Sequence, residues 1–164
     1  MVSVLHSCNL QGKALGAQCS SRGRLNVSAA VHDVRMADYH PWRNLRDLTN
    51  IDLIFTSLPP PLHSVTDGRR IWMHDRLLQV ERRCALAHEL VHIEHGDVCA
   101  QSEAVERAVR GEVAQRLVPF NRLVDAVRWS HDQFEVADEL WVTPAVLADR
   151  ITTLTPSELN ALRT

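Results

Sequence analysis

The segment His88-Glu89-Leu90-Val91-His92 places two imidazoles four residues apart, with a carboxylate next to the first. On a helix, residues i and i+4 project from one face, one turn apart, so both imidazoles can bind one metal ion at about 2.0–2.1 Å. The carboxylate of Glu89 lies beside them, too far to bind the metal but within reach of a water molecule on it. Glu89 can then act as general base, while the metal lowers the pKa of that water. The pattern therefore predicts metal-dependent hydrolysis, with His88 and His92 as ligands.

The same residues have a second interpretation, a solvated helix face that carries two histidines and a glutamate without any ion. The metal interpretation requires the segment to be helical. Apolar residues recur around it at the spacing of one helix face: Val80, Cys84, Ala87 and Val91. Gly96 supplies a stop signal for the helix. We therefore expect a helix over about residues 78–95, which carries the motif near its C-terminal end.

A catalytic zinc site needs three protein ligands and an open position, and the spacing leaves the third ligand undecided. A metzincin would continue with glycine at 95 and histidine at 98, whereas this chain has His95 and Val98, so that family is excluded. Other candidates stand at the end of the motif helix and on the next helix: His95, Asp97, Cys99, Glu103, Glu106 and Glu112. Each of the three glutamates has an arginine four residues later, so an exposed ion pair is the alternative for all of them.

Helical patterns continue after the motif. A second helix fits residues 102–117, with Ser102 as its N-cap and Pro119 beyond its end. Four further helices are expected, over about residues 120–128, over about 132–141, after Thr143-Pro144 and after Thr155-Pro156. In the last two, threonine is an N-cap and proline takes the first helical position. Thr155 and Glu158 also complete a capping box.

Shorter elements are expected before the motif helix: a helix over residues 40–48, a strand over 51–58 and a hairpin over 63–74. The helix has Pro41 in its first turn. The strand is a β-branched and aromatic run that three prolines close. Asp67-Gly68 lies between two strand-like runs, which indicates a hairpin with a type I′ turn, in which both central residues have positive φ.

These elements predict an α+β fold, with a small antiparallel or mixed sheet whose hairpin packs on the motif helix, followed by a helical C-terminal part. Residues 1–35 are rich in Ser, Gly, Asn and Gln and show no sustained period, so we expect a poorly ordered N-terminal extension. Residues 36–164 are expected to form a single domain. One hypothesis is that translation starts at Met36; an intact mass that includes residues 1–35 would contradict it.

The composition is that of an ordinary globular protein, with 45% hydrophobic and 23% charged residues and a net charge of -2. This charge supplies no overall positive field for nucleic acid, and the helix expected after Thr143 has Arg150 as its one basic residue. No run of about 20 apolar residues and no signal-peptide core are found, so we expect a cytoplasmic protein without a membrane segment. The cysteines are scattered and are expected to be free thiols: Cys8, Cys19, Cys84 and Cys99.

Two stretches of the chain resemble the ImmA/IrrE family of metallo-endopeptidases. The first runs from Glu81 to His92 and contains the motif, and the second runs from Val105 to Phe120. The likeness starts near Tyr39-His40-Pro41-Trp42-Arg43 and covers about residues 39–125. Counting back from Pro119, the family's metal-binding glutamate falls on Glu106. The resemblance therefore implies His88, His92 and Glu106 as metal ligands and Glu89 as the base.

The chain departs from the family at three positions. Glu112 stands where an aromatic residue is common, Val109 where a small residue is usual, and Val91 where glycine is frequent. The first two departures concern the register of the second helix, on which the assignment of Glu106 depends. Val91 affects no chemistry, because it faces away from the metal.

The resemblance also implies a fold and a function. It indicates a zincin-like fold and a single metallopeptidase domain over residues 36–164. Family members are intracellular, site-specific proteases whose substrates resemble helix-turn-helix repressors. We therefore expect an endopeptidase that cleaves a protein, a DNA-binding transcriptional repressor, and that itself binds neither nucleic acid nor membrane. Zinc is the expected ion, with manganese as the alternative.

Two other functions stay open. One is a metal-containing regulatory module that binds a protein without cutting it. The other is a purely structural metal site, which would need a fourth protein ligand such as Cys99 or Asp97. Replacing Glu89 separates the first of these from a peptidase, because a binding module does not need a general base.

Overall fold

A computed structural model of the chain describes residues 39–96 and 102–162. The expected N-terminal extension, the proposed start at Met36 and the candidate ligands Asp97 and Cys99 lie outside these residues. The described elements, in chain order, are α1 (Pro41–Asp47), β1 (Asp52–Thr56), β2 (Ser64–Thr66), β3 (Arg70–His74), α2 (Gln79–His95), α3 (Glu103–Leu117), α4 (Phe120–Trp129), α5 (Gln133–Glu139), α6 (Pro144–Thr152) and α7 (Pro156–Leu162). The expected α+β class is confirmed. No described helix is both long and apolar enough to cross a membrane.

The sheet is small and mixed. Its strand order is β1-β3-β2, with β1 parallel to β3 and β2 antiparallel to it. In the hairpin, Ser64 pairs with Met73 and Thr66 pairs with Ile71. Because alternate residues of a strand face opposite sides, this register places Ser64 and Thr66 on the same face as the buried Ile71 and Met73. A polar pair therefore lies on the inner face of an edge strand.

The hairpin turn differs from the expected type. Gly68 has a φ of 88°, but among the described non-glycine residues positive φ occurs at Trp141, so Asp67 does not adopt the left-handed conformation. Instead, Oδ1 of Asp67 accepts hydrogen bonds from the N–H groups of Arg69 (3.0 Å) and Arg70 (2.7 Å). The prediction of a type I′ turn was wrong because the aspartate side chain stabilises another turn in which only the glycine needs positive φ.

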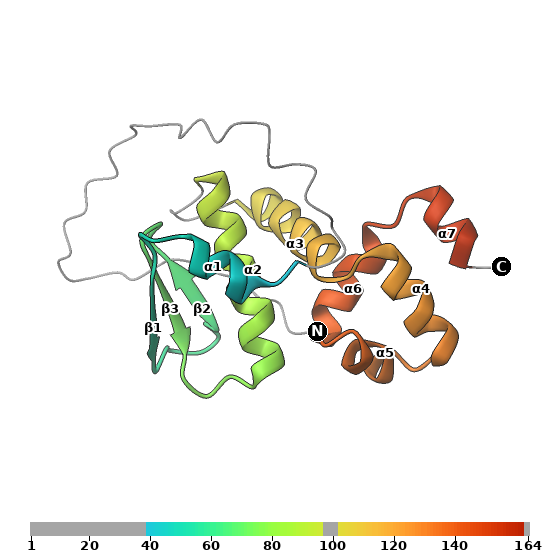
Figure 1. Cartoon of the computed structure of the whole chain (residues 1–164), viewed down its shortest axis with the longest axis horizontal. Coiled ribbons are helices and arrows are strands. Elements are labelled where there is room, and N and C mark those ends of the chain that lie inside the picture. The colour runs from blue at the N-terminus through green and yellow to red at the C-terminus, as the bar shows by residue number, and fades with distance from the viewer. Residues whose placement is uncertain (1–38, 97–101, 163–164) are drawn as a thin grey trace.

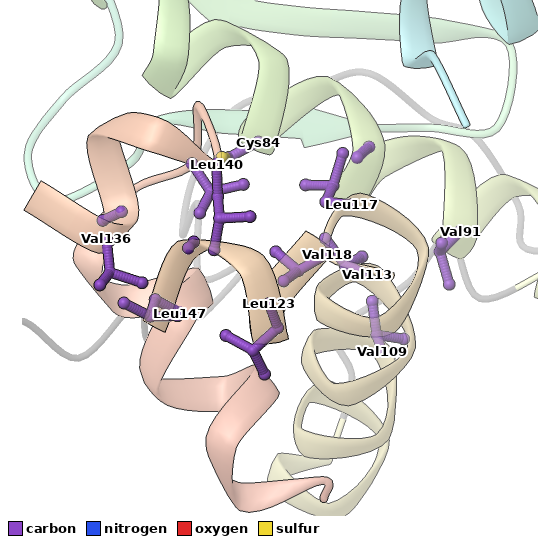
Figure 2. Packing of buried hydrophobic residues seen from close by; sticks show 14 residues of the cluster. Cys84, Val91, Val109, Val113, Leu117, Val118, Leu123, Val136, Leu140 and Leu147 are labelled. Carbon is purple, nitrogen blue, oxygen red and sulfur yellow. The ribbon is translucent and has the colours of Figure 1, made fainter. Parts of the chain in front are cut away.

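Helix α2 lies between two hydrophobic clusters. The first joins it to the sheet and to α1, and contains Ile71, Met73, Leu77, Leu86 and Leu90. The second joins it to the C-terminal helices and contains, among others, Ala87, Val91, Val109, Val113, Leu123 and Leu147 (Figure 2). In Figure 1 the sheet, α1 and α2 accordingly form one end of the molecule and α4–α7 the other. The motif helix is therefore held from both sides, which restricts the orientation of its side chains.

The C-terminal helices begin at the expected caps. Oγ1 of Thr143 accepts from the N–H of Val146 at 3.4 Å, and Thr155 and Glu158 form the reciprocal bonds of a capping box. Helix α5 ends at Glu139, two residues before the expected end. The reason is Trp141, which has a φ of 54° and occupies the position where a helix commonly ends in glycine. The guanidinium of Arg83 holds this residue by bonding its carbonyl at 2.7 Å and lying over its ring.

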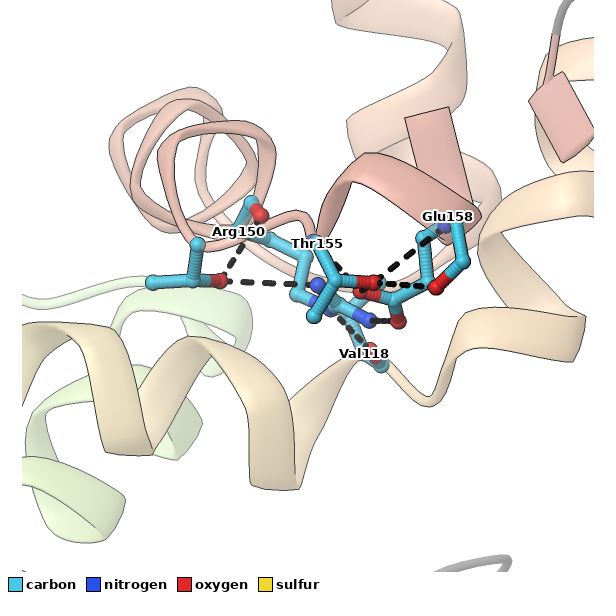
Figure 3. A network of polar contacts seen from close by, with 6 residues as sticks. Val118, Arg150, Thr155 and Glu158 are labelled. Atoms are coloured by element: carbon cyan, nitrogen blue, oxygen red, sulfur yellow. Dashed lines mark hydrogen bonds and ion pairs between the residues drawn. The ribbon is translucent and has the colours of Figure 1, made fainter. Parts of the chain in front are cut away.

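Arg150 is turned into the protein. Its Nε donates to the carbonyl of Val118 at 2.9 Å, and its Nη2 donates to Glu158 at 2.7 Å (Figure 3). These bonds tie α6 and α7 to the end of α3. Arg150 is the one basic residue of α6 and its side chain is 4% exposed, so α6 does not present it outward, as a helix that contacts DNA phosphates would.

Helices α3 and α6 pack closely at Gly111. A Cβ atom built on Gly111 would lie 3.1 Å from Cγ2 of Thr153. We therefore expect Gly111→Val to lower the free energy of unfolding by about 1–3 kcal/mol, because a branched side chain overpacks the contact. Urea unfolding monitored by circular dichroism measures this loss.

Thr153→Ser provides the matching test. It removes the methyl group at the contact and keeps the hydroxyl that donates to the Arg150 carbonyl at 2.8 Å. The double variant should recover part of the stability lost in Gly111→Val. Losses that simply add would contradict a steric contact between these two positions.

Candidate metal centre

Three of the predicted site residues meet at one point between α2 and α3. Nε2 of His88 and Nε2 of His92 are 3.0 Å apart. Oε2 of Glu106 lies 3.3 Å from the first nitrogen, and Oε1 of Glu106 lies 3.4 Å from the second. Within the described chain, these residues form the one group of three or more potential ligands that can hold a metal ion.

The spacing of these atoms suits zinc. Ligands placed tetrahedrally at about 2.0–2.1 Å from an ion are about 3.3 Å from one another. The separation of the two imidazole nitrogens is close to this value, and each nitrogen has a different oxygen of Glu106 at a similar distance. Two imidazoles with one carboxylate are a common donor set for catalytic zinc. His92 and Glu106 are buried and His88 is largely so. The side chains therefore have the chemistry, the spacing and the shielding that a bound ion needs.

Local sequence signals set the two helices that carry the ligands. Gly96, with a φ of 74°, ends α2 one turn after His92. Ser102 starts α3, because its Oγ accepts from the N–H of Val105 at 3.3 Å. Glu106 therefore falls near the N-terminus of α3, where the helix dipole favours a negative charge.

The structure separates Glu106 from the two glutamates that fit the ion-pair alternative. Glu103 pairs with Arg107 at 3.3 Å, and both side chains are exposed. Glu112 pairs with Arg116, also four residues later. Glu106 forms no such pair with Arg110 among the described residues: it faces the two histidines, and Arg110 lies 3.8 Å from Asp149 instead.

His95 lies outside the group. Its Nε2 is 3.0 Å from Oε2 of Glu112, and both side chains are more than one third exposed. Glu112 and its partner Arg116 form a second polar cluster with Glu94, whose Oε2 is 2.7 Å from Arg116. His95 and Glu112 are therefore engaged with each other, outside the group of His88, His92 and Glu106.

Glu89 is held by a residue that the sequence did not single out. Oγ of Ser64 donates to Oε1 of Glu89 at 2.7 Å, and both side chains are buried. A buried carboxylate is costly unless it accepts hydrogen bonds, so this contact stabilises the observed position of Glu89. The signal available in the sequence was the hairpin register, which places a polar residue on the strand face that packs against the motif helix.

The environment keeps Glu106 ionised. Burial raises the pKa of its carboxyl, but the hydrogen bonds and charges of His88 and His92 outweigh burial and bring the pKa well below the usual range. An ion that binds here requires neutral imidazoles and supplies the positive charge in their place, so protons and metal compete for the same site.

The chain matches no protein-family model, no curated protein and no solved structure. Membership of the ImmA/IrrE family and a zincin-like packing therefore stay predictions from the motif residues.

Proposed function

We propose that this protein is a zinc metallo-endopeptidase that hydrolyses a peptide bond in a protein substrate. The observation that supports this most directly is the meeting of His88, His92 and Glu106. Glu89, which follows His88 in the chain, is a buried carboxylate on the same helix. The described residues supply three ligands, and a site with three protein ligands has the open coordination position that catalysis needs. The single carboxylate among the ligands keeps manganese as the alternative ion.

Each site residue then has a role in the reaction. Zinc held by these residues would supply Lewis-acid chemistry, which lowers the pKa of a water molecule and polarises the carbonyl group of the substrate. Glu89 takes a proton from the attacking water and returns it to the leaving amine. Ser64 holds one oxygen of Glu89 and so restricts the orientation of the carboxylate that takes the proton. His88, His92 and Glu106 hold the ion in place.

The substrate class comes from the resemblance alone. ImmA/IrrE proteases act on proteins that resemble helix-turn-helix repressors, and we propose a repressor of this kind as the substrate, met in the cytoplasm. The inward position of Arg150 is consistent with a protease that contacts the repressor and not its DNA.

Metal analysis and cleavage mapping test this function together. Elemental mass spectrometry of the purified protein should find about one zinc ion per chain. The zinc-loaded protein, incubated with a proteome-derived peptide library and with a repressor encoded beside its gene, should create a small set of new N-termini. A chelator should abolish them. Absence of zinc at this stoichiometry, or cleavage that persists with the chelator, contradicts the proposal.

The contact between Ser64 and Glu89 gives a separate prediction. Ser64→Ala should lower the cleavage rate by about tenfold to a hundredfold, because a misplaced catalytic group loses rate without losing substrate binding. It should also lower the free energy of unfolding by about 1–3 kcal/mol, since a buried carboxylate oxygen loses its donor. Zinc content should not change. Steady-state kinetics on a cleaved peptide should show a lower kcat at similar KM.

Two variants control this test. Ser64→Thr keeps the donor and should restore most of the rate. Thr66→Val removes a hydroxyl from the same face of the same strand, where it bonds the turn at Arg70 and Gly68. It should cost stability with little loss of kcat; an equal loss of kcat would mean that Ser64 matters only for folding.

A further inference from the structure

Helix α6 brings a carboxylate to Arg110, which follows Glu106 by four residues on α3. Asp149 Oδ2 lies 3.8 Å from Nε of Arg110 on α3. Both side chains are partly shielded, with 32% and 26% of their surface exposed. This pair joins two helices, whereas the Glu103–Arg107 pair on the same helix α3 is local and exposed.

The placement of Asp149 follows from the close packing at Gly111. Thr153, whose methyl group lies against Gly111, is the C-cap of α6 and comes four residues after Asp149, so Asp149 lies about one turn earlier on the same side of the helix. Gly111 is the neighbour of Arg110 in the chain. Because position 111 has no side chain, the C-terminal end of α6 can lie close to α3. Asp149, about one turn before Thr153, then comes within 3.8 Å of Arg110.

Asp149 also interacts electrostatically with His88. Burial raises the pKa of its carboxyl, and the charges of Arg110 and His88 partly offset this effect. His88 is thus within electrostatic range of Asp149, although the two residues lie on helices that are distant in the sequence.

Arg110 is a potential competitor for a metal ligand. It follows Glu106 by four residues, the spacing at which acidic and basic side chains pair along a helix. The other two glutamate–arginine pairs of α3 with this spacing do form. A guanidinium that donated to Glu106 would occupy carboxylate oxygens that the metal needs, and its positive charge would oppose a cation.

We infer that Asp149 is a positioning residue of the metal site: by pairing with Arg110 it keeps the guanidinium away from Glu106. The inference rests on the proposed metal site. The C-terminal helices would then contribute to metal binding, because Asp149 on α6 keeps Glu106 on α3 available to the ion.

Zinc titration of the full-length metal-free protein against a chromophoric chelator tests this inference without any activity assay. Asp149→Asn should weaken zinc binding by about tenfold to a hundredfold, the usual effect of losing a residue that supports a ligand. Arg110→Met should bind zinc within about twofold of the unchanged protein. The double variant Asp149→Asn/Arg110→Met should regain most of the lost affinity, because the competing cation is gone.

Controls separate the possible outcomes. Glu103→Gln removes an acidic partner of arginine from the same helix and should not change zinc affinity. Thermal unfolding of each metal-free variant reports whether it folds. If Asp149→Asn does not fold, Asp149→Ala takes its place. Unchanged affinity in Asp149→Asn, or a double variant as weak as the single one, overturns the inference while the metal site stands. A wild-type protein that binds no zinc overturns both.

Discussion

Replacing Glu89 with glutamine is expected to leave zinc bound and to lower the rate of peptide cleavage by about a hundredfold to ten thousandfold. This range is what a positioned general base typically contributes. Glutamine has nearly the same shape and can still accept a hydrogen bond from Ser64, so the buried contact survives. The amide cannot take a proton from water. Zinc content and single-turnover cleavage of a mapped peptide measure the two effects separately.

Glu103→Gln is the matched control for this variant. It makes the same chemical change at an exposed glutamate whose partner is Arg107, and it should cleave at the normal rate. Normal cleavage by Glu89→Gln would rule out the proposed mechanism. The same variant distinguishes a peptidase from a regulatory binding module, because a module that only binds a repressor should retain its binding and its phenotype without the carboxylate.

Replacing Glu106 with glutamine should remove most of the zinc affinity. The amide carries no charge to offset the ion, and one of three ligands is weakened, so we expect a loss of more than about a hundredfold, beyond the effect of supporting residues. Zinc at about 100 times its dissociation constant should stabilise the unchanged protein by about 2.7 kcal/mol. The variant should gain little at that concentration. Chelator competition and thermal unfolding with and without zinc measure both effects.

The other candidate ligands provide the controls. Glu112→Gln and His95→Gln change the two residues that pair with each other outside the group. Both variants should bind zinc normally. If His95→Gln lost zinc and Glu106→Gln kept it, the third ligand would be His95 and the geometry described here would be wrong at this point.

The two hydrophobic clusters explain why these effects should be separable from folding. Helix α2 is fixed against the sheet by Leu86 and Leu90 and against the C-terminal helices by Ala87 and Val91, all of which are fully buried. The site residues add little to these clusters. Conservative changes at the site should therefore alter metal binding or rate more than the position of the helix.

Local patterns in the sequence were sufficient to predict most of the helices and strands, and the motif residues His88, Glu89 and His92 of the candidate site. The apolar spacing around His88 and His92 predicts the motif helix, and its end at Gly96 is confirmed. The caps at Ser102, Thr143 and Thr155 are confirmed as well. These features depend on interactions between residues a few positions apart, which the sequence displays directly. The prediction of a type I′ turn at Asp67 was wrong because the Asp67 side chain accepts hydrogen bonds from the backbone of Arg69 and Arg70 and so stabilises another turn.

The position of the proposed third ligand, Glu106, depends on how the helices pack against one another. Each of Glu103, Glu106 and Glu112 has an arginine four residues later, so spacing did not distinguish them. The family resemblance indicated Glu106 from the register of the second helix. In the structure, the crossing of α2 and α3 brings Glu106 to the histidines and leaves Arg110 to Asp149. Ser64 was likewise found only where the hairpin meets α2. Such contacts join residues far apart in the chain, and no local period encodes how two elements are placed relative to each other.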